Sequence, residues 1–126
     1  MVLKAKFRKL LFDRDDYCWH CGDTETLVPH HRKNRGMGGS SSDEANRLDN
    51  LMLVCWGWND LMERHAQSAQ EARSWGHKLQ MWQRPQTPVY DRVAGLWWVL
   101  EPDGTRGKFV VDESKAFRLQ LPDLFE

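Results

Sequence analysis

The sequence predicts an α+β fold, and three features of its apolar pattern lead to this class. A short apolar run at residues 27–28, which leads into His30 and His31, and the segment 48–54 are the two strand candidates. From Gly57 onward, apolar residues recur at spacings of three and four, which is typical of a helix that buries one face. Residues 93–101 and 108–111 flank a turn sequence and predict a β-hairpin. With 126 residues, the chain is long enough for one domain with a modest core.

The N-terminal part combines a basic segment with two cysteines. Residues 4–12 alternate basic and apolar side chains and predict a short amphipathic helix whose cations stay in solvent. Cys18-x-x-Cys21 followed by glycine has the form of a zinc knuckle, in which two thiolates share a tetrahedral ion. With Cys55 the chain has three cysteines, which is not the disulfide framework of a secreted domain. The sequence predicts either a structural zinc site or reduced thiols packed against Trp58.

Two adjacent histidines, His30 and His31, end the first strand candidate. Because side chains alternate along a strand, one imidazole can hold a metal while its neighbour faces a substrate. Histidines at such positions also cap strands or satisfy buried polar groups. The cations that follow, Arg32, Lys33 and Arg35, stand in a loop rich in Gly and Ser. Such a loop either approaches a sugar-phosphate backbone closely or is a solvated flexible connection.

The second strand candidate lies between a polar turn and a helix that carries further polar candidates. Residues 43–47 could form a helical turn, in which Asn46 is a turn or capping residue. On the helix, Asn59 and Glu63 are one turn apart, so both can face the same ion. Glu63 could equally be a carboxylate of the helix surface. His65 lies on another side of the helix and is expected to support the fold or to neighbour the substrate.

The C-terminal part predicts an appended unit. Residues 70–83 continue or restart the helix, with a break at Gly76. Pro85 and Pro88 then mark a linker. The predicted division is therefore 1–84 for the core with its helical extension and 85–126 for the linker and hairpin packed on it. The hairpin aromatics are expected in the core, and a base-stacking platform is the alternative.

The chain contains, in this order, Cys-x-x-Cys, His-His, Asn-Leu and Leu-x-Cys, and its histidine pair begins the sequence HHRKNRGMGGS. This arrangement resembles the HNH endonuclease family, especially small HNH proteins of tailed bacteriophages. The resemblance covers residues 18–77. It implies a ββα-metal core, with the N-terminal helix and zinc-knuckle-like turn before it and the β-hairpin after it. Residue by residue, it implies that His31 is the general base, His30 the adjacent metal ligand, Asn50 the central asparagine that holds the loop, and Asn59 the third conserved position.

The chain departs from the commonest family pattern at two positions. The third position is usually histidine, whereas Asn59 offers an amide oxygen that suits a hard ion such as Mg²⁺. The family usually completes its zinc site with a second Cys-x-x-Cys, whereas Trp58 stands where the fourth cysteine is expected. His20 is the nearest substitute ligand by sequence but lies inside the knuckle turn. Asn46 is an alternative to Asn50 as the central asparagine. Because His30 and His31 are adjacent, the sequence leaves open which of them is the general base.

The resemblance implies metal-dependent hydrolysis of DNA phosphodiester bonds. A divalent metal (Mg²⁺, Mn²⁺, Ni²⁺ or Zn²⁺) would be held by His30 and Asn59 with help from Glu63. Three cations would offset phosphate charge: Arg32, Lys33 and Arg35. The alternatives are a non-catalytic nucleic-acid-binding module on a degenerate HNH scaffold and an accessory of phage DNA packaging that works with terminase. One site cuts one strand, so double-strand cleavage requires a homodimer or two successive nicks by a monomer.

Charge and hydropathy bear on partners and location. The formal net charge is zero, but residues 1–42 hold eight Lys/Arg against five Asp/Glu, whereas residues 85–126 hold five against seven. DNA binding is therefore expected to depend less on salt than for a basic DNA-binding protein. No apolar run approaches the length that spans a membrane, and no apolar leader precedes the basic N-terminus. These features predict a soluble cytoplasmic protein, and the resemblance to bacteriophage HNH proteins implies the cytoplasm of a bacterial host.

Overall fold

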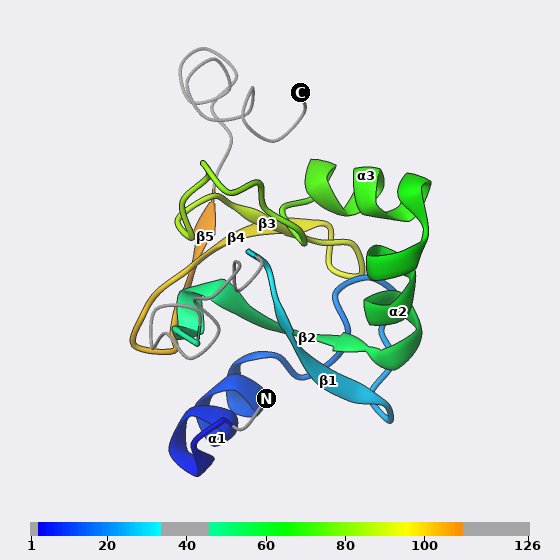
Figure 1. Ribbon diagram of the computed structural model, residues 1–126. Coiled ribbons are helices and arrows are strands. Elements are labelled where there is room, and N and C mark those ends of the chain that lie inside the picture. The colour runs from blue at the N-terminus through cyan, green and yellow to red at the C-terminus, as the bar shows by residue number, and fades with distance from the viewer. Residues whose placement is uncertain (1–2, 34–45, 110–126) are drawn as a thin grey trace.

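The structure is a computed structural model that describes residues 3–33 and 46–109. Within these residues the chain forms three α-helices, one short 3-10 helix and two small antiparallel sheets, so the predicted α+β class is confirmed. None of the described helices is long and apolar enough to cross a membrane. In chain order the elements are α1 (Ala5–Arg14), β1 (Leu27–His31), the 3-10 helix η1 (Leu48–Asn50), β2 (Leu51–Cys55), α2 (Trp56–Arg64), α3 (Ala66–Ser74), β3 (Val89–Asp91), β4 (Leu96–Leu100) and β5 (Arg106–Phe109) (Figure 1).

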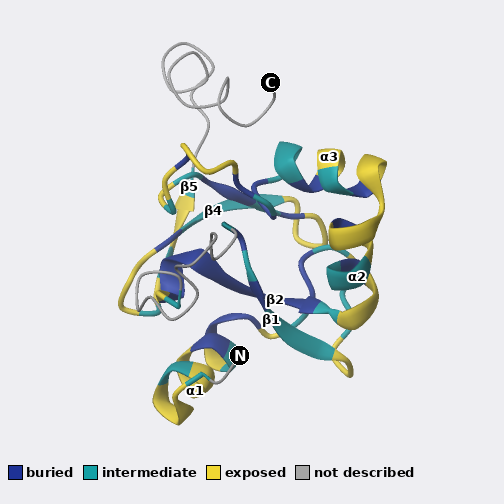
Figure 2. Ribbon diagram, in the orientation of Figure 1, coloured by how far each residue is buried: buried dark blue, intermediate teal, exposed yellow. Residues whose placement is uncertain are grey.

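The centre of the fold is β2, which pairs antiparallel with β1 over its full length and leads directly into α2. Four of its five residues are buried, because both faces of the strand are covered (Figure 2). Leu51 and Leu53 pack in a cluster with α1, while Met52 and Val54 pack in a second cluster that includes Trp58. This alternation has the two-residue period of a strand, and it explains why the sequence of β2 is continuously apolar.

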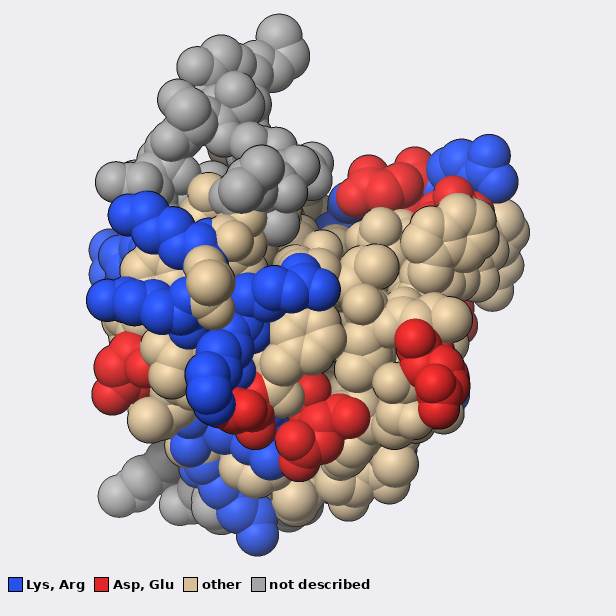
Figure 3. Space-filling view, turned by 90° about the horizontal axis from the view of Figure 1, so that it is seen from below, with Lys and Arg blue, Asp and Glu red and all other residues tan. Residues whose placement is uncertain are grey.

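Hydrogen bonds from charged side chains at the end of α1 hold this helix against β2. The guanidinium of Arg14 donates to the backbone oxygens of Leu48 and Leu51 at 2.8 and 2.6 Å. The Asp15 carboxylate accepts from the backbone N–H of Leu53 at 2.9 Å. Figure 3 looks at the molecule from below Figure 1, the side on which α1 lies, and shows Lys and Arg side chains gathered over one part of this face. The cations of the predicted N-terminal helix are exposed, as expected: Lys4, Lys6, Arg8 and Lys9.

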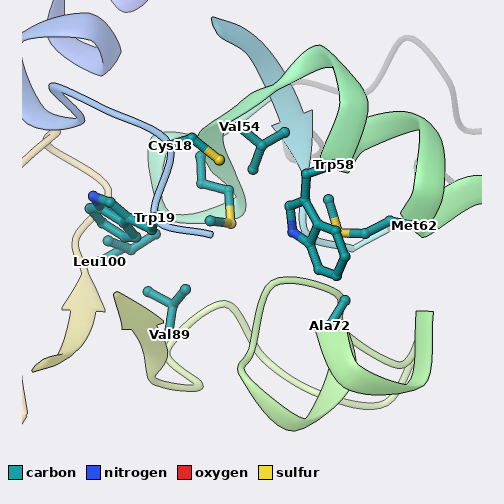
Figure 4. Packing of buried hydrophobic residues seen from close by; sticks show 9 residues of the cluster. Cys18, Trp19, Val54, Trp58, Met62, Ala72, Val89 and Leu100 are labelled. Atoms are coloured by element: carbon teal, nitrogen blue, oxygen red, sulfur yellow. The ribbon is translucent and has the colours of Figure 1, made fainter. Parts of the chain in front are cut away.

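The C-terminal sheet has the order β3-β4-β5, which is one strand more than the predicted hairpin. β4 and β5 form that hairpin, and β3 pairs with the other edge of β4. The three-residue strand that follows Pro88 is too short to show a two-residue period in the sequence. Val89 and Leu100 of this sheet belong to the same buried cluster as Val54 and Trp58 (Figure 4).

The helix predicted from residue 57 is two helices in the structure. α2 ends at Arg64 and α3 begins at Ala66, because His65 has extended backbone angles (φ −117°, ψ 115°). The His65 ring then caps α3, accepting from the backbone N–H of Ser68 at 3.3 Å. The predicted break at Gly76 is confirmed, because α3 ends two residues earlier and Gly76 has φ +72°, a left-handed angle that favours glycine.

We predict that Gly76→Ala destabilises the fold by about 2–4 kcal/mol. A Cβ atom at this position would lie 2.1 Å from the backbone oxygen of Pro88, and alanine is strained at this φ. Urea denaturation provides the measurement. The matched control is Gly57→Ala in α2, where a Cβ meets nothing within 4 Å. That substitution should be neutral or stabilise the protein by up to about 1 kcal/mol, and equal effects of the two substitutions would contradict the prediction.

Candidate functional site

His30 and Asn59 meet between β1 and α2. His30 is buried, and its Nδ1 atom lies 3.2 Å from Oδ1 of Asn59. Its other ring nitrogen, Nε2, lies 2.7 Å from the backbone oxygen of His77. Because a carbonyl oxygen can only accept, Nε2 carries the hydrogen. Burial lowers the pKa of His30 to about 4, so the ring is neutral at pH 7 and Nδ1 presents a lone pair toward Asn59.

The distance between these two atoms can be compared with the distance between two ligands of a divalent cation. An amide can turn to bring its NH₂ group to the ring nitrogen. With its oxygen there, the lone pairs of His30 and Asn59 face the same point, 3.2 Å apart. Two adjacent ligands of an octahedral ion, each about 2.1 Å from it, are separated by about 3 Å. A histidine ligand commonly donates its second N–H to a carbonyl, as His30 does to His77. These two atoms could therefore both contact one metal ion.

His77 supports this pair from the segment after α3. Its ring is fully buried; Nδ1 accepts from the indole N–H of Trp58 at 3.1 Å, and Nε2 donates to the backbone oxygen of Tyr90 at 2.7 Å. Burial lowers the pKa of His77 to about 3, so this ring is neutral too. Sequence reasoning missed His77 as a support for His30, because the contact is made by a backbone oxygen, which any residue could provide.

His31 has different neighbours from His30. It is half-buried, and its Nε2 atom lies 2.9 Å from Oδ1 of Asn46. Asn46, which the sequence leaves as a rival of Asn50, is thus placed at His31. The two asparagines contact different parts of the site.

Asn50 connects η1, through hydrogen bonds, to the residues that follow β1. Its side chain is buried; Oδ1 accepts the backbone N–H of Lys33 at 2.9 Å, and Nδ2 donates to the backbone oxygen of the same residue at 3.2 Å. The backbone oxygen of Asn50 also accepts the N–H of Arg32 at 2.8 Å. These three bonds hold the two residues that directly follow His31.

The prediction that Arg32 offsets phosphate charge is wrong. Its side chain is fully buried, and all three guanidinium nitrogens donate to backbone oxygens. Burial lowers its pKa to about 9, so the group is still charged at pH 7. Arg32 stands next to a basic loop, so the sequence suggested a cation that faces solvent. The residues that bury Arg32 are far from it in the sequence and could not be identified there. The accepting residues are Asp49, Gly76, Pro85 and Thr87.

The other two predicted cations have different positions. Lys33 is half-buried and directs its ammonium to the backbone oxygen of Gln83 at 2.9 Å. Arg35, with most of the glycine-rich loop, lies outside the described residues. Of the three predicted phosphate contacts, Lys33 is therefore the one whose side chain the structure places beside the site without burying it completely.

Glu63 carries a carboxylate that is about half exposed and lies 3.8 Å from the ammonium of Lys78. The charge of Lys78 also contributes to lowering the pKa of His30, after the larger effect of burial. Sequence reasoning did not select Lys78. The structure thus brings a cation to the carboxylate that was predicted to help hold the metal.

Cys18, Cys21 and Cys55 form a second candidate site. Their sulfurs lie within 4.8 Å of one another, with Cys21 and Cys55 3.6 Å apart. Sulfur ligands of a tetrahedral zinc ion, with bonds of about 2.3 Å, are about 3.8 Å apart. Burial raises the pKa of Cys18 and raises that of Cys55 to about 12, so without a metal both are neutral thiols at pH 7. The cluster could hold a metal ion such as zinc.

Trp58 and His20 stack beside this cluster. Their ring centroids are 3.7 Å apart and their planes differ by 8°. Burial, with a smaller effect of Arg92, lowers the pKa of His20 to about 4. The group of potential ligands found among the described residues contains the three cysteines and not His20. Trp58 also donates its backbone N–H to the sulfur of Cys55 at 3.2 Å, so it contacts the cluster without supplying a ligand.

Comparison with protein-family models, with curated proteins and with solved structures finds no match to this chain. The HNH resemblance therefore stays a prediction from sequence motifs. The functional conclusion depends on the residues of the two candidate sites and on the contacts described above.

We predict that the protein loses stability as the pH falls below about 6.5. His30 and His77 are neutral in the fold, with pKa values of about 4 and about 3, but titrate near 6.5 when unfolded. Unfolding at lower pH therefore takes up protons, and the stabilisation present above pH 6.5 is lost as the pH falls toward the folded values. Each ring should contribute a slope of about 1.4 kcal/mol per pH unit to the free energy of unfolding.

Denaturant titrations at pH 7 and pH 5 measure this slope. His77→Gln should reduce it by about the contribution of one histidine. A slope that is the same in the wild type and in His77→Gln would contradict the prediction.

We predict that the three-cysteine cluster binds one equivalent of Co²⁺ or Zn²⁺. Cobalt titration should produce the sulfur-to-metal charge-transfer absorption of thiolate ligands, and Cys21→Ser should weaken or abolish it. His20→Gln is the control and should keep the full absorption, because His20 stacks on Trp58 and is not among the cluster ligands. Zinc at one hundred times its Kd should stabilise the fold by about 2.7 kcal/mol. Equal cobalt spectra for the wild type and Cys21→Ser would contradict this assignment.

Proposed function

We propose that this chain is a metal-dependent nuclease of the HNH type that hydrolyses phosphodiester bonds in DNA. The observation that carries the proposal is the contact between Nδ1 of His30 and Oδ1 of Asn59, 3.2 Å apart, directly beside His31. The order of β1, β2 and α2 along the chain is the one that a ββα-metal core requires. His30 and His31 lie on β1 and Asn59 lies on α2, which supports the proposal.

The residues that would hold the catalytic metal are His30 and Asn59. When bound, a divalent cation such as Mg²⁺, Mn²⁺, Ni²⁺ or Zn²⁺ would supply positive charge for the scissile phosphate and the leaving oxygen. Neutral His31 would take the proton of the attacking water, with its ring oriented by Asn46 at 2.9 Å. Asn50 would hold the chain that follows His31 through its two bonds to Lys33.

A second candidate is a non-catalytic nucleic-acid-binding module on the same scaffold, and the contact of Glu63 favours it. Its carboxylate lies beside the Lys78 ammonium at 3.8 Å, so two protein ligands rather than three remain for the catalytic metal. Roles in phage DNA processing or packaging, association with terminase, a homodimer and a place in the bacterial cytoplasm stay predictions.

Cleavage of supercoiled plasmid distinguishes the two candidates. We predict metal-dependent nicking with at least one of Mg²⁺, Mn²⁺, Ni²⁺ and Zn²⁺, and no nicking in EDTA. His31→Ala should slow nicking by about 10²- to 10⁴-fold, the usual contribution of a general base, while DNA affinity stays close to that of the wild type. Asn59→Ala should raise the metal concentration needed for half-maximal nicking, because it removes one of two ligands.

The matched control is His65→Ala, which removes an exposed histidine at the junction of α2 and α3 and should keep the nicking rate. A wild-type rate in His31→Ala would refute its role as the base. Retained DNA binding without nicking in any of the four metals would favour the binding module instead.

A further inference from the structure

The segment between α3 and β3 contains a turn whose tip presents two large apolar side chains to solvent. Met81 is 61% exposed and Trp82 is 63% exposed. Single exposed apolar residues are common on protein surfaces, but two adjacent large ones at the tip of a turn form a more specific feature. Among the contacts of the described residues, neither side chain has a hydrogen-bonding or ring partner.

The turn is held in shape without these two side chains. The backbone N–H of Gln83 donates to the oxygen of Gln80 at 3.0 Å, and the buried side chain of Gln83 accepts the N–H of Gln80 at 2.8 Å. The Lys33 ammonium donates to the backbone oxygen of Gln83 at 2.9 Å. The tip is therefore pre-organised, which lowers the entropy cost of binding through Met81 and Trp82.

The turn also begins at the candidate site. Leu79, the residue before it, donates its backbone N–H to the oxygen of Arg32 at 2.6 Å and pairs with Lys33 in a parallel bridge. Arg32 directly follows His31, so backbone contacts connect the start of the turn to the end of the strand that carries both histidines. A ligand strand that passes His31 is within reach of the turn.

Basic residues lie on both sides of the exposed tip in the sequence. Arg84 follows the tip after one residue and is exposed, and the half-buried Lys33 contacts the turn through the backbone oxygen of Gln83. Lys78, which precedes the turn, lies 3.8 Å from the carboxylate of Glu63. An exposed aromatic ring among Lys and Arg is the combination with which proteins bind single strands, since bases stack on the ring while cations contact phosphates. A nucleic-acid strand matches these cations better than an apolar protein surface does.

We propose that Trp82 stacks on a nucleobase of the strand bound at the His30–His31 site, with Met81 packing against the neighbouring nucleotide. This deepens the proposed function and rests on it for the identity of the ligand. The base is unpaired or is displaced from its stack by the Met81–Trp82 tip, as apolar wedges do in other nucleic-acid complexes. The turn thus adds a sequence-tolerant contact to the strand next to the site.

The test is DNA binding in EDTA, so that cleavage does not affect the result. Fluorescence anisotropy of a labelled oligonucleotide, single-stranded and as a duplex, compares the wild type with Trp82→Ala and Trp82→Phe. Trp82→Ala should bind the single strand about 5- to 150-fold more weakly, the loss expected for one base–aromatic stack. Trp82→Phe should recover most of the affinity, because it keeps an aromatic face.

Trp56→Ala is the matched control. Trp56 is also 63% exposed, but it begins α2 at the far end of the β1–β2 pair, where Cys55 faces Leu27. His31 faces Leu51 at the other end, about 13 Å away for five residues of strand. Trp56→Ala should keep wild-type affinity. The salt dependence separates stacking from charge: Trp82→Ala should leave the slope of log K against log salt unchanged, and Arg84→Ala should reduce it by about one.

Equal affinities of Trp82→Ala and Trp56→Ala would overturn the proposal. So would a Trp82→Ala variant that keeps DNA affinity but loses self-association in sedimentation, because the tip would then be an interface between copies of the chain. The proposed nuclease function is judged separately by plasmid nicking. Loss of binding in Trp82→Ala supports the stacking role even if no metal produces nicking, whereas nicking with full binding in Trp82→Ala supports the nuclease alone.

Discussion

The buried guanidinium of Arg32 is the interaction on which the rest of the site depends. A buried charge is tolerated only when it is paired or saturated with hydrogen bonds, and removing such partners typically costs several kcal/mol. Here four backbone oxygens, from η1, the end of the α3 segment and the approach to β3, accept from one side chain. Because Arg32 follows His31 directly, the same bonds that join these segments also fix the end of β1. The left-handed Gly76 permits the close approach to Pro88 that this arrangement requires.

The two candidate metal sites are connected through Trp58. Its backbone N–H donates to the sulfur of Cys55, while its indole N–H donates to His77, whose backbone oxygen orients His30. Trp58, which stands where the HNH pattern expects a fourth cysteine, thus contacts both the cysteine cluster and His77, the residue that orients His30. The resemblance implies a four-sulfur zinc site at this position, and in this chain an aromatic residue occupies the fourth place while packing in the core (Figure 4).

Burial determines the chemistry of the histidines. His30 and His77 are neutral because each is buried. Each donates its N–H to a backbone oxygen, which leaves the second nitrogen as an acceptor of defined direction. His31, one residue later, is only half-buried and contacts Asn46. Adjacent residues with the same side chain thereby have different environments, which is the separation of roles that a metal ligand and a general base require. The contact of Glu63 with Lys78 is the feature that fits this arrangement least well.

The sequence by itself determined the α+β class, the strands around the histidine pair, the helix break at Gly76 and the set of three cysteines. These features depend on local periodicity and on residue type, which can be read along the chain. Only the tertiary structure decided that Arg32 is buried, that Asn46 contacts His31 and that the backbone of His77 orients His30, because each depends on partners that are distant in sequence. It also divided the predicted helix at His65 and added β3, since a single extended residue and a three-residue strand leave little periodic signal.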